Sequence, residues 1–218
     1  MALAIFDLDN TLLAGDSDHA WGNYLVQRKL VDTAQHQQAN DYFYQQYQAG
    51  TLDIHEYVQF VVTPLKKLSP DELEKLRIDF LRDVVENMVA PGTQALLRRH
   101  REAGDELLII TATIDVITAP IAQLLEVPNL LATIPERSSS TGFTGRIDGT
   151  PAFQEGKIER LQGWLDKQPR QWDEHWFYSD SHNDLPLLRQ VDHPVAVDPD
   201  DHLRAEAERQ SWPIISLR

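Results

Sequence analysis

Six short apolar runs, each followed by polar or turn-forming residues, constrain the fold of this chain more than any other feature. They lie at residues 2–6, 106–111, 129–134, 175–178, 194–197 and 213–217. Helical patterns separate several of them, and the clearest covers residues 93–103, between Pro91-Gly92 and Gly104. Shorter helical patterns occur at 157–165 and 185–190. Strands that alternate with helices predict an α/β fold with a parallel, helix-covered sheet.

One long segment interrupts this alternation. Between about residues 15 and 88 there is no convincing strand run, and the apolar residues follow helical spacing. A compact fold rarely tolerates so long a crossover without structure of its own, so the segment predicts an α-helical insert. Eight of the 18 aromatic residues lie between Gly15 and Leu65, and we interpret them as the core of this insert. The expected division is residues 1–13 and 89–218 for the α/β core and 14–88 for a helical cap.

Composition excludes several kinds of partner and chemistry. Acidic residues outnumber basic ones 34 to 20, a net charge of −14 whose field repels nucleic acids and anionic membranes. The absence of cysteine excludes disulfides, thiolate metal sites and cysteine nucleophiles. We find no signal peptide and no apolar stretch of the roughly 18 residues that a membrane helix requires. We therefore expect a soluble, cytoplasmic protein. A Ser-, Thr- and Gly-rich stretch at 137–151 predicts a turn or hairpin whose role the sequence leaves open.

Two carboxylates follow the first predicted strand. Asp7 and Asp9 are separated by one residue, and with a strand-like period of two they could project to the same side. Carboxylates this close repel one another unless a proton or a cation lies between them. A hard divalent cation such as Mg²⁺ prefers oxygen ligands and would relieve the repulsion. An Asx-rich turn after a strand explains the same residues without any cation, and the segment alone does not decide between the two.

A second acidic group follows the strand predicted at 175–178. Asp180 and Asp184 lie at its carboxyl end, the edge at which open α/β sheets bind ligands. They could complete or orient an oxygen-ligand cation site with Asp7. Alternatively, Ser181 or Asn183 caps the short helix that begins near residue 185. Capping and cation binding are compatible, so neither excludes the other.

Two further polar residues fit the same edge of the sheet. Thr111 ends the run at 107–110, and its hydroxyl could donate to a phosphate oxygen. Lys157 opens a predicted helix and could place a positive charge on a phosphoryl group. Taken alone, each has an ordinary structural explanation, as a strand-end threonine and a solvated lysine. Their weight comes from occurring together with the two acidic groups.

The order of these motifs resembles that of the haloacid dehalogenase-like superfamily, and the resemblance covers essentially the whole chain. Its four motifs correspond here to 6–12 (FDLDNTL), Thr111, Lys157 and 180–184. The resemblance implies a Rossmann-like core, and the insert looks like the helical cap of the phosphoserine phosphatase-like branch. Within that branch the chain is most similar to bacterial histidinol-phosphate phosphatases of this fold.

The resemblance implies a role for each acidic residue of the motifs. Asp7 would be the nucleophile that forms an aspartyl-phosphate, and Asp9 would protonate the leaving alkoxide and then activate water. Mg²⁺ would be bound by Asp7, the backbone carbonyl of Asp9 and Asp180, with Asp184 supporting the site. Dehalogenases lack the second acid because a halide needs no proton, so the pair Asp7 and Asp9 favours phosphoryl transfer.

The remaining motif residues would bind the phosphoryl group, and some depart from the family pattern. Thr111 and Lys157 would hold it, with Asn183 nearby and Ala112 among the substrate-binding residues. Phosphoserine phosphatases usually have two glycines where Ala112 and Thr113 stand, and Gly-Asp-Gly where Ser-Asp-Ser stands at 179–181. These replacements are small and leave the chemistry intact, but they weaken a phosphoserine assignment.

The predicted cap carries acids and lacks the expected arginine. In the family an acid after the first motif binds the substrate ammonium, and Asp16 matches it; a cap arginine binds the carboxylate. No arginine lies between Arg28 and Arg77. We hypothesise that the cap selects a cationic alcohol phosphate without a carboxylate, such as histidinol phosphate, through Asp16, Asp18 and His19. The alternative is that these acids form a solvated helix start.

Other functions remain open at this stage. Phosphoserine or another amino-alcohol phosphate is the second substrate, and a phosphomutase would use the same aspartyl-phosphate. A phospho-accepting regulatory or binding protein with a site that does not turn over is the non-enzyme alternative. The insert argues against a signalling receiver, which needs no cap. The expected partner is a small phosphorylated metabolite, with no nucleic acid and no membrane.

Overall fold

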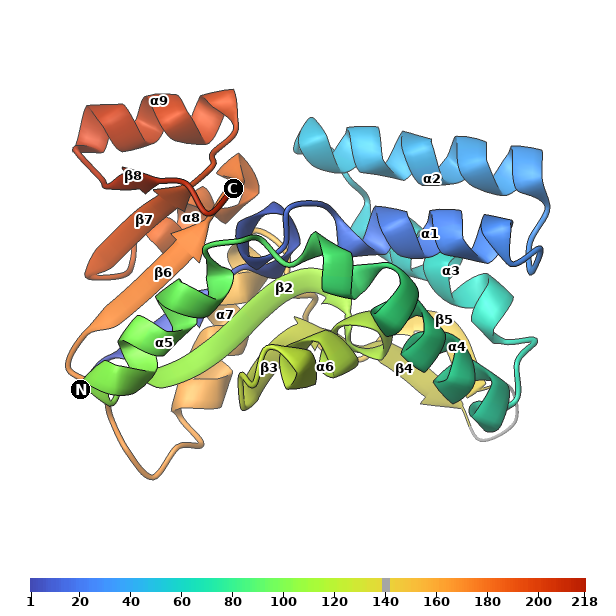
Figure 1. The fold of residues 1–218 in the computed structure, drawn as a ribbon, viewed down its shortest axis with the longest axis horizontal. Coiled ribbons are helices and arrows are strands. Elements are labelled where there is room, and N and C mark those ends of the chain that lie inside the picture. The colour runs from blue at the N-terminus through green and yellow to red at the C-terminus, as the bar shows by residue number, and fades with distance from the viewer. Residues whose placement is uncertain (139–141) are drawn as a thin grey trace.

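The computed structural model describes residues 1–138 and 142–218 and contains a parallel six-stranded sheet flanked by helices (Figure 1). The strand order is β3-β2-β1-β6-β7-β8. The strands are β1 (Leu3–Phe6), β2 (Glu106–Ile114), β3 (Asn129–Thr133), β6 (His175–Ser179), β7 (His193–Val197) and β8 (Ile214–Ile215). Each of the six predicted runs forms one of these strands, and the predicted α/β class is confirmed.

Alternation along the strands divides the apolar core between two faces of the sheet. Leu3 and Ile5 of β1 pack on one face with residues of α7, α8 and α9, whereas Ala4 and Phe6 pack on the other with α5 and α6. The helices are α5 (Thr93–Ala103), α6 (Asp115–Leu124), α7 (Glu155–Leu165), α8 (Leu185–Leu188) and α9 (Asp201–Gln210). Helices on both faces keep the central strands dry, so that polar groups gather at the strand ends.

The segment between β1 and β2 is helical, as predicted. Residues 15–88 are all described. They form α1 (Ser17–Gln27), α2 (Thr33–Gln48), α3 (Ile54–Leu65), α4 (Pro70–Asp83) and a short 3₁₀ turn at Val85–Met88. Each helix begins at a capping residue, because an uncapped first turn leaves backbone N–H groups unpaired. Asp16, Asp32 and Asp53 accept these N–H bonds, and Ser69 forms a reciprocal capping box with Glu72.

The helical insert packs onto the sheet through aromatic side chains. Trp21 and Tyr24 of α1 contact Phe80 of α4, with ring centroids 5.0 and 5.3 Å apart. These three side chains belong to the same buried cluster as Phe6 of the sheet. The interpretation of the aromatic residues between Gly15 and Leu65 as a core therefore holds for Trp21 and Tyr24, but that core is continuous with the sheet. Gly22 allows α2 to approach closely, since a Cβ there would lie 2.3 Å from the Asn40 side chain.

The two segments that join the insert to the sheet lie side by side. Leu13 forms an antiparallel bridge with Val89, and Ala14 N–H donates to the Met88 carbonyl at 2.6 Å. The chain thus leaves and re-enters the sheet layer at one place, at the residues where the predicted boundaries fall. The division into a core and a cap domain itself remains a prediction.

Two features differ from expectation. β2 continues through Ala112 and Thr113 to Ile114, so Thr111 does not end the strand; its pairing with β3 shifts between Thr111 and Ile114. The predicted hairpin is formed by β4 (Pro135–Ser138) and β5 (Gly142–Ile147), and it begins before residue 137. Residues 139–141 of the predicted segment lie outside the described residues. β5 packs against α3, where Lys66 Nζ donates to the Thr144 carbonyl at 2.9 Å (Figure 1).

No helix within residues 1–138 and 142–218 has both the length and the apolar character needed to cross a bilayer.

Candidate active site

The topology of the sheet brings three sequence motifs to one edge. β1 lies between β2 and β6, and Phe6 pairs with Ile109 on one side and Tyr178 on the other. Since all three strands run in the same direction, their carboxyl ends are neighbours. Residues that follow these pairings in the sequence, Asp7 and Asp180 among them, therefore come together although more than 170 residues separate them.

Lys157 is buried between two carboxylates, Asp7 and Asp184. Its Nζ donates to Asp7 Oδ1 at 2.8 Å and lies 2.7 Å from Asp184 Oδ1 and 2.8 Å from Asp184 Oδ2. Ser179 Oγ also donates to Asp184 Oδ2, at 2.7 Å. Lys157 lies in the first turn of α7, beside Gly156, where a Cβ would meet the Pro151 carbonyl at 2.1 Å. Glycine is required at residue 156 because any side chain there would clash with the backbone of the preceding loop.

Burial and ion pairing act against each other in this cluster. Burial raises the pKa of Asp7 to about 7, although Lys157 opposes the rise and Asp184 adds to it. Burial disfavours the charge on Lys157, yet Asp184 and Asp7 together raise the pKa of the ammonium above its usual range. Lys157 is therefore a fixed positive charge, in contrast to the solvated lysine that its position alone suggested.

Asp180 joins Asp7 through a threonine hydroxyl. Thr11 Oγ1 lies 3.3 Å from Asp7 Oδ2 and 3.0 Å from Asp180 Oδ1, and it accepts the Asp180 backbone N–H at 3.0 Å. Burial, and then repulsion from Asp7, raises the pKa of Asp180 well above its usual range. We call Asp7, Lys157, Asp180 and Asp184 the strand-end cluster. It holds three carboxylates against one ammonium, so protein cations leave part of its negative charge uncompensated.

The donor set of the strand-end cluster suits a small hard cation with few protein ligands. Among the described residues, no three Asp, Glu, His or Cys side chains converge as ligands of one metal ion. Asp184 is paired with Lys157, and only Asp7 and Asp180 share a common partner, the Thr11 hydroxyl. Two carboxylates with a backbone carbonyl are an all-oxygen set, which Mg²⁺ accepts because it retains several waters. The residues thus fit Mg²⁺ with Asp184 outside the ligand set.

Asp9 points away from the strand-end cluster. Its Oδ1 accepts the backbone N–H of Ser17 at 2.6 Å, and its Oδ2 accepts the hydroxyl of Thr113 at 2.8 Å. The chain turns sharply just after Asp9, where Asn10 adopts a left-handed φ of 57° within the tight turn Leu8–Leu12. Burial raises the pKa of Asp9 to about 7. The two acids of the first motif therefore have separate partners instead of sharing a single cation through their side chains.

Thr111 and Thr113, two residues apart in β2, form different hydrogen bonds. Thr111 Oγ1 accepts the Thr113 backbone N–H at 3.2 Å, which leaves its own hydrogen available to donate. The Thr113 hydroxyl, by contrast, donates its hydrogen to Asp9. Both residues line a cavity together with Ala112. Thr113 was not predicted as a partner of Asp9, although its spacing of two from Thr111 places both on one side of a strand.

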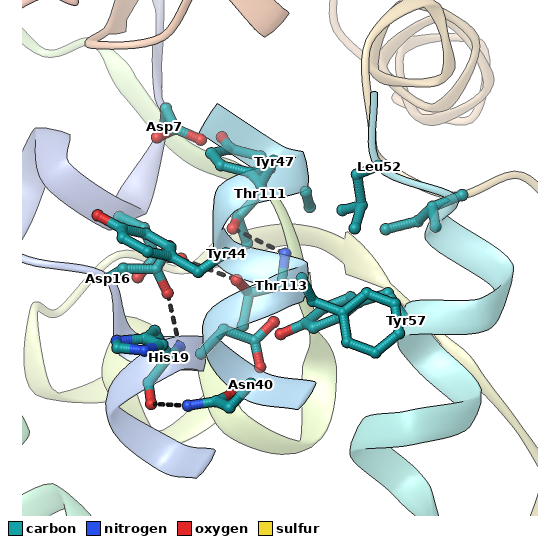
Figure 2. A pocket seen from close by; sticks show the side chains of 15 residues that line it. Asp7, Asp16, His19, Asn40, Tyr44, Tyr47, Leu52, Tyr57, Thr111 and Thr113 are labelled. Carbon is teal, nitrogen blue, oxygen red and sulfur yellow. Dashed lines mark hydrogen bonds between the residues drawn. The ribbon is translucent and has the colours of Figure 1, made fainter. Parts of the chain in front are cut away.

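A cavity of about 490 Å³, partly open to solvent, lies between the sheet edge and the insert. Asp7, Asp9 and the segment 111–113 form one wall, and the insert forms the rest. The insert contributes ten lining residues, namely Asp16, Asp18, His19, Asn40, Phe43, Tyr44, Tyr47, Leu52, Ile54 and Tyr57. Figure 2 shows Tyr44 and Tyr57 on opposite sides of Thr113 in this view, with Asp16 and His19 beyond Tyr44. Four of the aromatic residues interpreted as insert core thus line a cavity.

The insert side of the cavity is acidic and aromatic. None of the lining residues in the described part of the chain is a lysine or an arginine. Asp16 caps α1 by accepting the His19 N–H at 2.7 Å. His19 Nε2 lies 2.8 Å from Asp41 Oδ1, and its ring stacks on Tyr44 with centroids 4.7 Å apart. The candidates Asp16, Asp18 and His19 are therefore all in the cavity wall, but Asp16 and His19 already have protein partners.

Asn183 connects the strand ends to the insert. Its Nδ2 donates to the Tyr47 carbonyl at 2.9 Å, and its Oδ1 accepts from Gln154 Nε2 at 3.1 Å. Gln154 Nε2 also donates to the Gly50 carbonyl at 3.3 Å. Asn183 does not line the cavity. Ser181 Oγ accepts the Asn183 N–H at 3.2 Å and so caps the 3₁₀ turn His182–Asp184 that leads into α8, whereas the first turn of α8 itself has no side-chain cap.

The fold and this constellation of residues correspond to a known enzyme family. Residues 4–189 match the family model of haloacid dehalogenase-like hydrolases, and the chain belongs to that family. It is a phosphatase, a phosphoric monoester hydrolase, and the regulatory and binding alternatives are set aside.

Three similar proteins each match this chain over most of the length of both chains. The chain is 42% identical over 219 residues to a histidinol-phosphatase of Neisseria meningitidis serogroup C (strain 8013), covering 99% of both chains. A Bordetella pertussis Tohama I protein of unknown function has a solved structure with a TM-score of 0.92 and 38% identity, over 100% of this chain and 99% of that one. A substrate-bound phosphoserine phosphatase shares the fold, with a TM-score of 0.69 at 15% identity over 99% and 92% of the two chains.

Proposed function

We propose that this phosphatase is a Mg²⁺-dependent phosphomonoesterase that works through an aspartyl-phosphate on Asp7. The proposed substrate is a small cationic amino-alcohol phosphate, with histidinol phosphate as the first choice. One observation carries the proposal: the Asp7 carboxylate, paired with buried Lys157, lies in the wall of a cavity whose other side is acidic and aromatic, with no lysine or arginine among the described lining residues. Residues 14–88 would serve as the cap domain that closes over the substrate.

Asp7 would attack the phosphorus while the ester bond breaks. A carboxylate oxygen of Asp7 forms the new O–P bond, and the ester oxygen leaves with the bonding electron pair. Asp9, held by Ser17 and Thr113, gives its proton to that oxygen, so the product alcohol leaves neutral. In the second step Asp9 takes a proton from water, whose oxygen attacks phosphorus and releases Asp7 and inorganic phosphate. Two partners on Asp9 keep its carboxyl oriented through both steps.

Positive charge at the phosphoryl group would come from two sources. Asp7, Asp180 and the backbone carbonyl of Asp9 would hold Mg²⁺, which offsets the charge of the phosphoryl oxygens when it is bound. Lys157 supplies the other charge, as a buried ammonium held beside the nucleophile by Asp7 and Asp184. The Thr111 hydroxyl provides a neutral donor, with Ala112 next to it in the cavity wall.

The insert side of the cavity favours a cationic ring-bearing alcohol. Phosphoserine carries a carboxylate, which requires a positive partner that the cavity wall lacks. Histidinol phosphate carries an ammonium and an imidazole, and the wall offers acids for the first and tyrosine and phenylalanine faces for the second. The similarity to a histidinol-phosphatase at 42% identity supports the same choice.

A substrate panel tests the proposal. We expect the purified enzyme with Mg²⁺ to release phosphate from p-nitrophenyl phosphate and to have its highest kcat/KM for histidinol phosphate. The panel should include phosphoserine, phosphoethanolamine and sugar phosphates. Faster turnover of phosphoserine than of histidinol phosphate would refute the substrate assignment, while acid-stable phosphoserine or phosphothreonine in place of labile phosphoaspartate in the trapped enzyme would refute the mechanism.

A further inference from the structure

We propose that Asp18 is the residue that binds the substrate ammonium and so determines specificity for amino-alcohol phosphates. This inference rests on the proposed function and assigns one of its contacts to one carboxylate. Three acidic or basic side chains of the α1 start line the cavity: Asp16, Asp18 and His19. Their hydrogen bonds differ, and that difference selects Asp18.

Asp16 and His19 are engaged in holding α1 and α2. Asp16 Oδ1 accepts the His19 backbone N–H at 2.7 Å as the N-cap of α1. The His19 ring contacts Asp41 at 2.8 Å, and its backbone carbonyl accepts Asn40 Nδ2 at 2.9 Å. A ligand that recruited the His19 ring would have to compete with Asp41, and one that recruited Asp16 would share a carboxylate that already caps α1. Both residues are better explained as structural parts of the cavity wall than as the group that binds the substrate ammonium.

Asp18 is buried with one carboxylate oxygen unpaired. The residue is 7% exposed, and Oδ1 is shielded from solvent with no hydrogen-bond partner. Burial and then Asp16 raise the pKa of Asp18 well above its usual range, while the hydroxyls of Tyr57 and Thr113 oppose the rise. Thr113 has already given its hydrogen to Asp9. An unpaired buried carboxylate is costly in free energy, and a cation from the ligand would remove that cost.

The protein supplies no cation of its own at this position. Asp18 forms no ion pair within residues 1–138 and 142–218, and the lining of the cavity in those residues includes neither lysine nor arginine. Thr113, which donates to Asp9, is also a neighbour of Asp18. In a vicinal amino-alcohol phosphate the nitrogen and the ester oxygen lie on neighbouring carbon atoms. An ammonium at Asp18 therefore leaves the ester oxygen near Asp9.

A pair of substrates that differ only in the amine tests this inference. We would measure kcat/KM for histidinol phosphate and for its des-amino analogue, 3-(imidazol-4-yl)propyl phosphate, in wild type and Asp18→Asn. We expect wild type to favour the amine and Asp18→Asn to reduce the ratio of the two values roughly 10- to 100-fold, as for one charge-assisted hydrogen bond. The matched control is Asp32→Asn, which removes one charge from the exposed N-cap of α2 and leaves a good capping residue. Its ratio should match wild type within about twofold.

A second measurement separates failure of this inference from failure of the proposed function. With p-nitrophenyl phosphate as substrate, we would compare inhibition by histidinol and by 3-(imidazol-4-yl)propan-1-ol, which differ in the same amine. If histidinol phosphate is not hydrolysed but wild type prefers the amine in this assay and Asp18→Asn does not, the proposed substrate is wrong and the role of Asp18 stands. If wild type shows no preference, or if Asp18→Asn keeps the wild-type ratio, Asp18 is not the ammonium site. The wild-type preference requires no variant, so the inference stays testable even if Asp18→Asn does not fold.

Discussion

The strand-end cluster and the α1 start bury their carboxylates in opposite ways. In the strand-end cluster, Asp7 and Asp184 share the ammonium of Lys157, and Thr11 lies between Asp7 and Asp180. At the α1 start, Asp18 has a buried oxygen without a partner and no cation within the described residues. One region is organised before a ligand arrives, whereas the other depends on the ligand for its missing charge.

This difference matches what each region has to do. Phosphoryl chemistry requires charges that are already in place when the transition state forms, because reorganising them costs free energy. Discrimination between substrates benefits from a group that stays unsatisfied until the correct ligand binds, since a wrong ligand then leaves it unpaired. Five measurements test this difference between the two regions, beginning with the variant expected to lose the most activity.

The largest effect is expected from Asp7→Asn. An amide has no negative charge and cannot form the aspartyl-phosphate, so kcat/KM for p-nitrophenyl phosphate should fall by at least roughly 10⁴-fold. Asp32→Asn serves again as the matched control and should retain activity. Asp7→Asn with more than a tenth of wild-type activity would show that another group attacks the phosphorus.

The second-largest effect on activity is expected from removal of the divalent cation. EDTA is expected to lower activity at least about 100-fold, with recovery on addition of excess Mg²⁺, because a divalent cation offsets charge on the phosphoryl oxygens. Thermal unfolding gives a readout without turnover: Mg²⁺ should raise Tm of wild type by binding the folded state, and should raise it less in Asp180→Asn. Equal shifts of Tm in the two proteins would place the cation away from Asp180.

Lys157→Met tests whether the strand-end cluster is compensated by its lysine. The change keeps much of the side-chain volume but leaves Asp7 and Asp184 buried together without the ammonium. We expect a loss of about 3 kcal/mol in the free energy of unfolding, measured with urea near pH 7. A loss below about 1 kcal/mol would mean that water or protonation replaces Lys157 easily.

Asp18→Asn should have the contrasting effect on stability. Since Oδ1 of Asp18 has no partner in the folded protein, the amide should leave the free energy of unfolding unchanged or raise it by up to about 1 kcal/mol. The same urea titration as for Lys157→Met gives the comparison directly. A destabilisation as large as that of Lys157→Met would remove the distinction between the two regions.

The smallest effect is expected where the two regions meet. Asn183→Ala removes the hydrogen bonds to the Tyr47 carbonyl and Gln154, and Gln154→Ala removes those to Asn183 and the Gly50 carbonyl. Each should raise KM by about fivefold or less, a total of about 1 kcal/mol, with kcat nearly unchanged, because these bonds position the insert and do not touch the reacting atoms. A large fall of kcat in Asn183→Ala alone would favour the phosphoryl contact that the sequence predicted for Asn183.

Much of the fold was predictable because its signals are local. Apolar runs identified the strands, and capping residues such as Asp16 and Ser69 mark the helix starts. The end of β2 was misjudged, since Thr111 is polar but continues a buried strand through Ile114. The aromatic residues were only partly understood: helical spacing shows that a side chain faces inward, but not whether it meets another side chain or a cavity.

Short stretches of sequence are enough to predict the parallel α/β class, the helical insert and the acids of the first and fourth motifs, because strand ends, caps and motif order are local features. The partner of each acid depends on the tertiary structure. Lys157 meets Asp7 across 150 residues, Asp9 turns instead to Ser17 and Thr113, and Asp18 has no cation partner among the described residues. Electrostatic partners depend on distances within a few ångströms between segments remote in sequence, and burial sets how strongly each charge is felt.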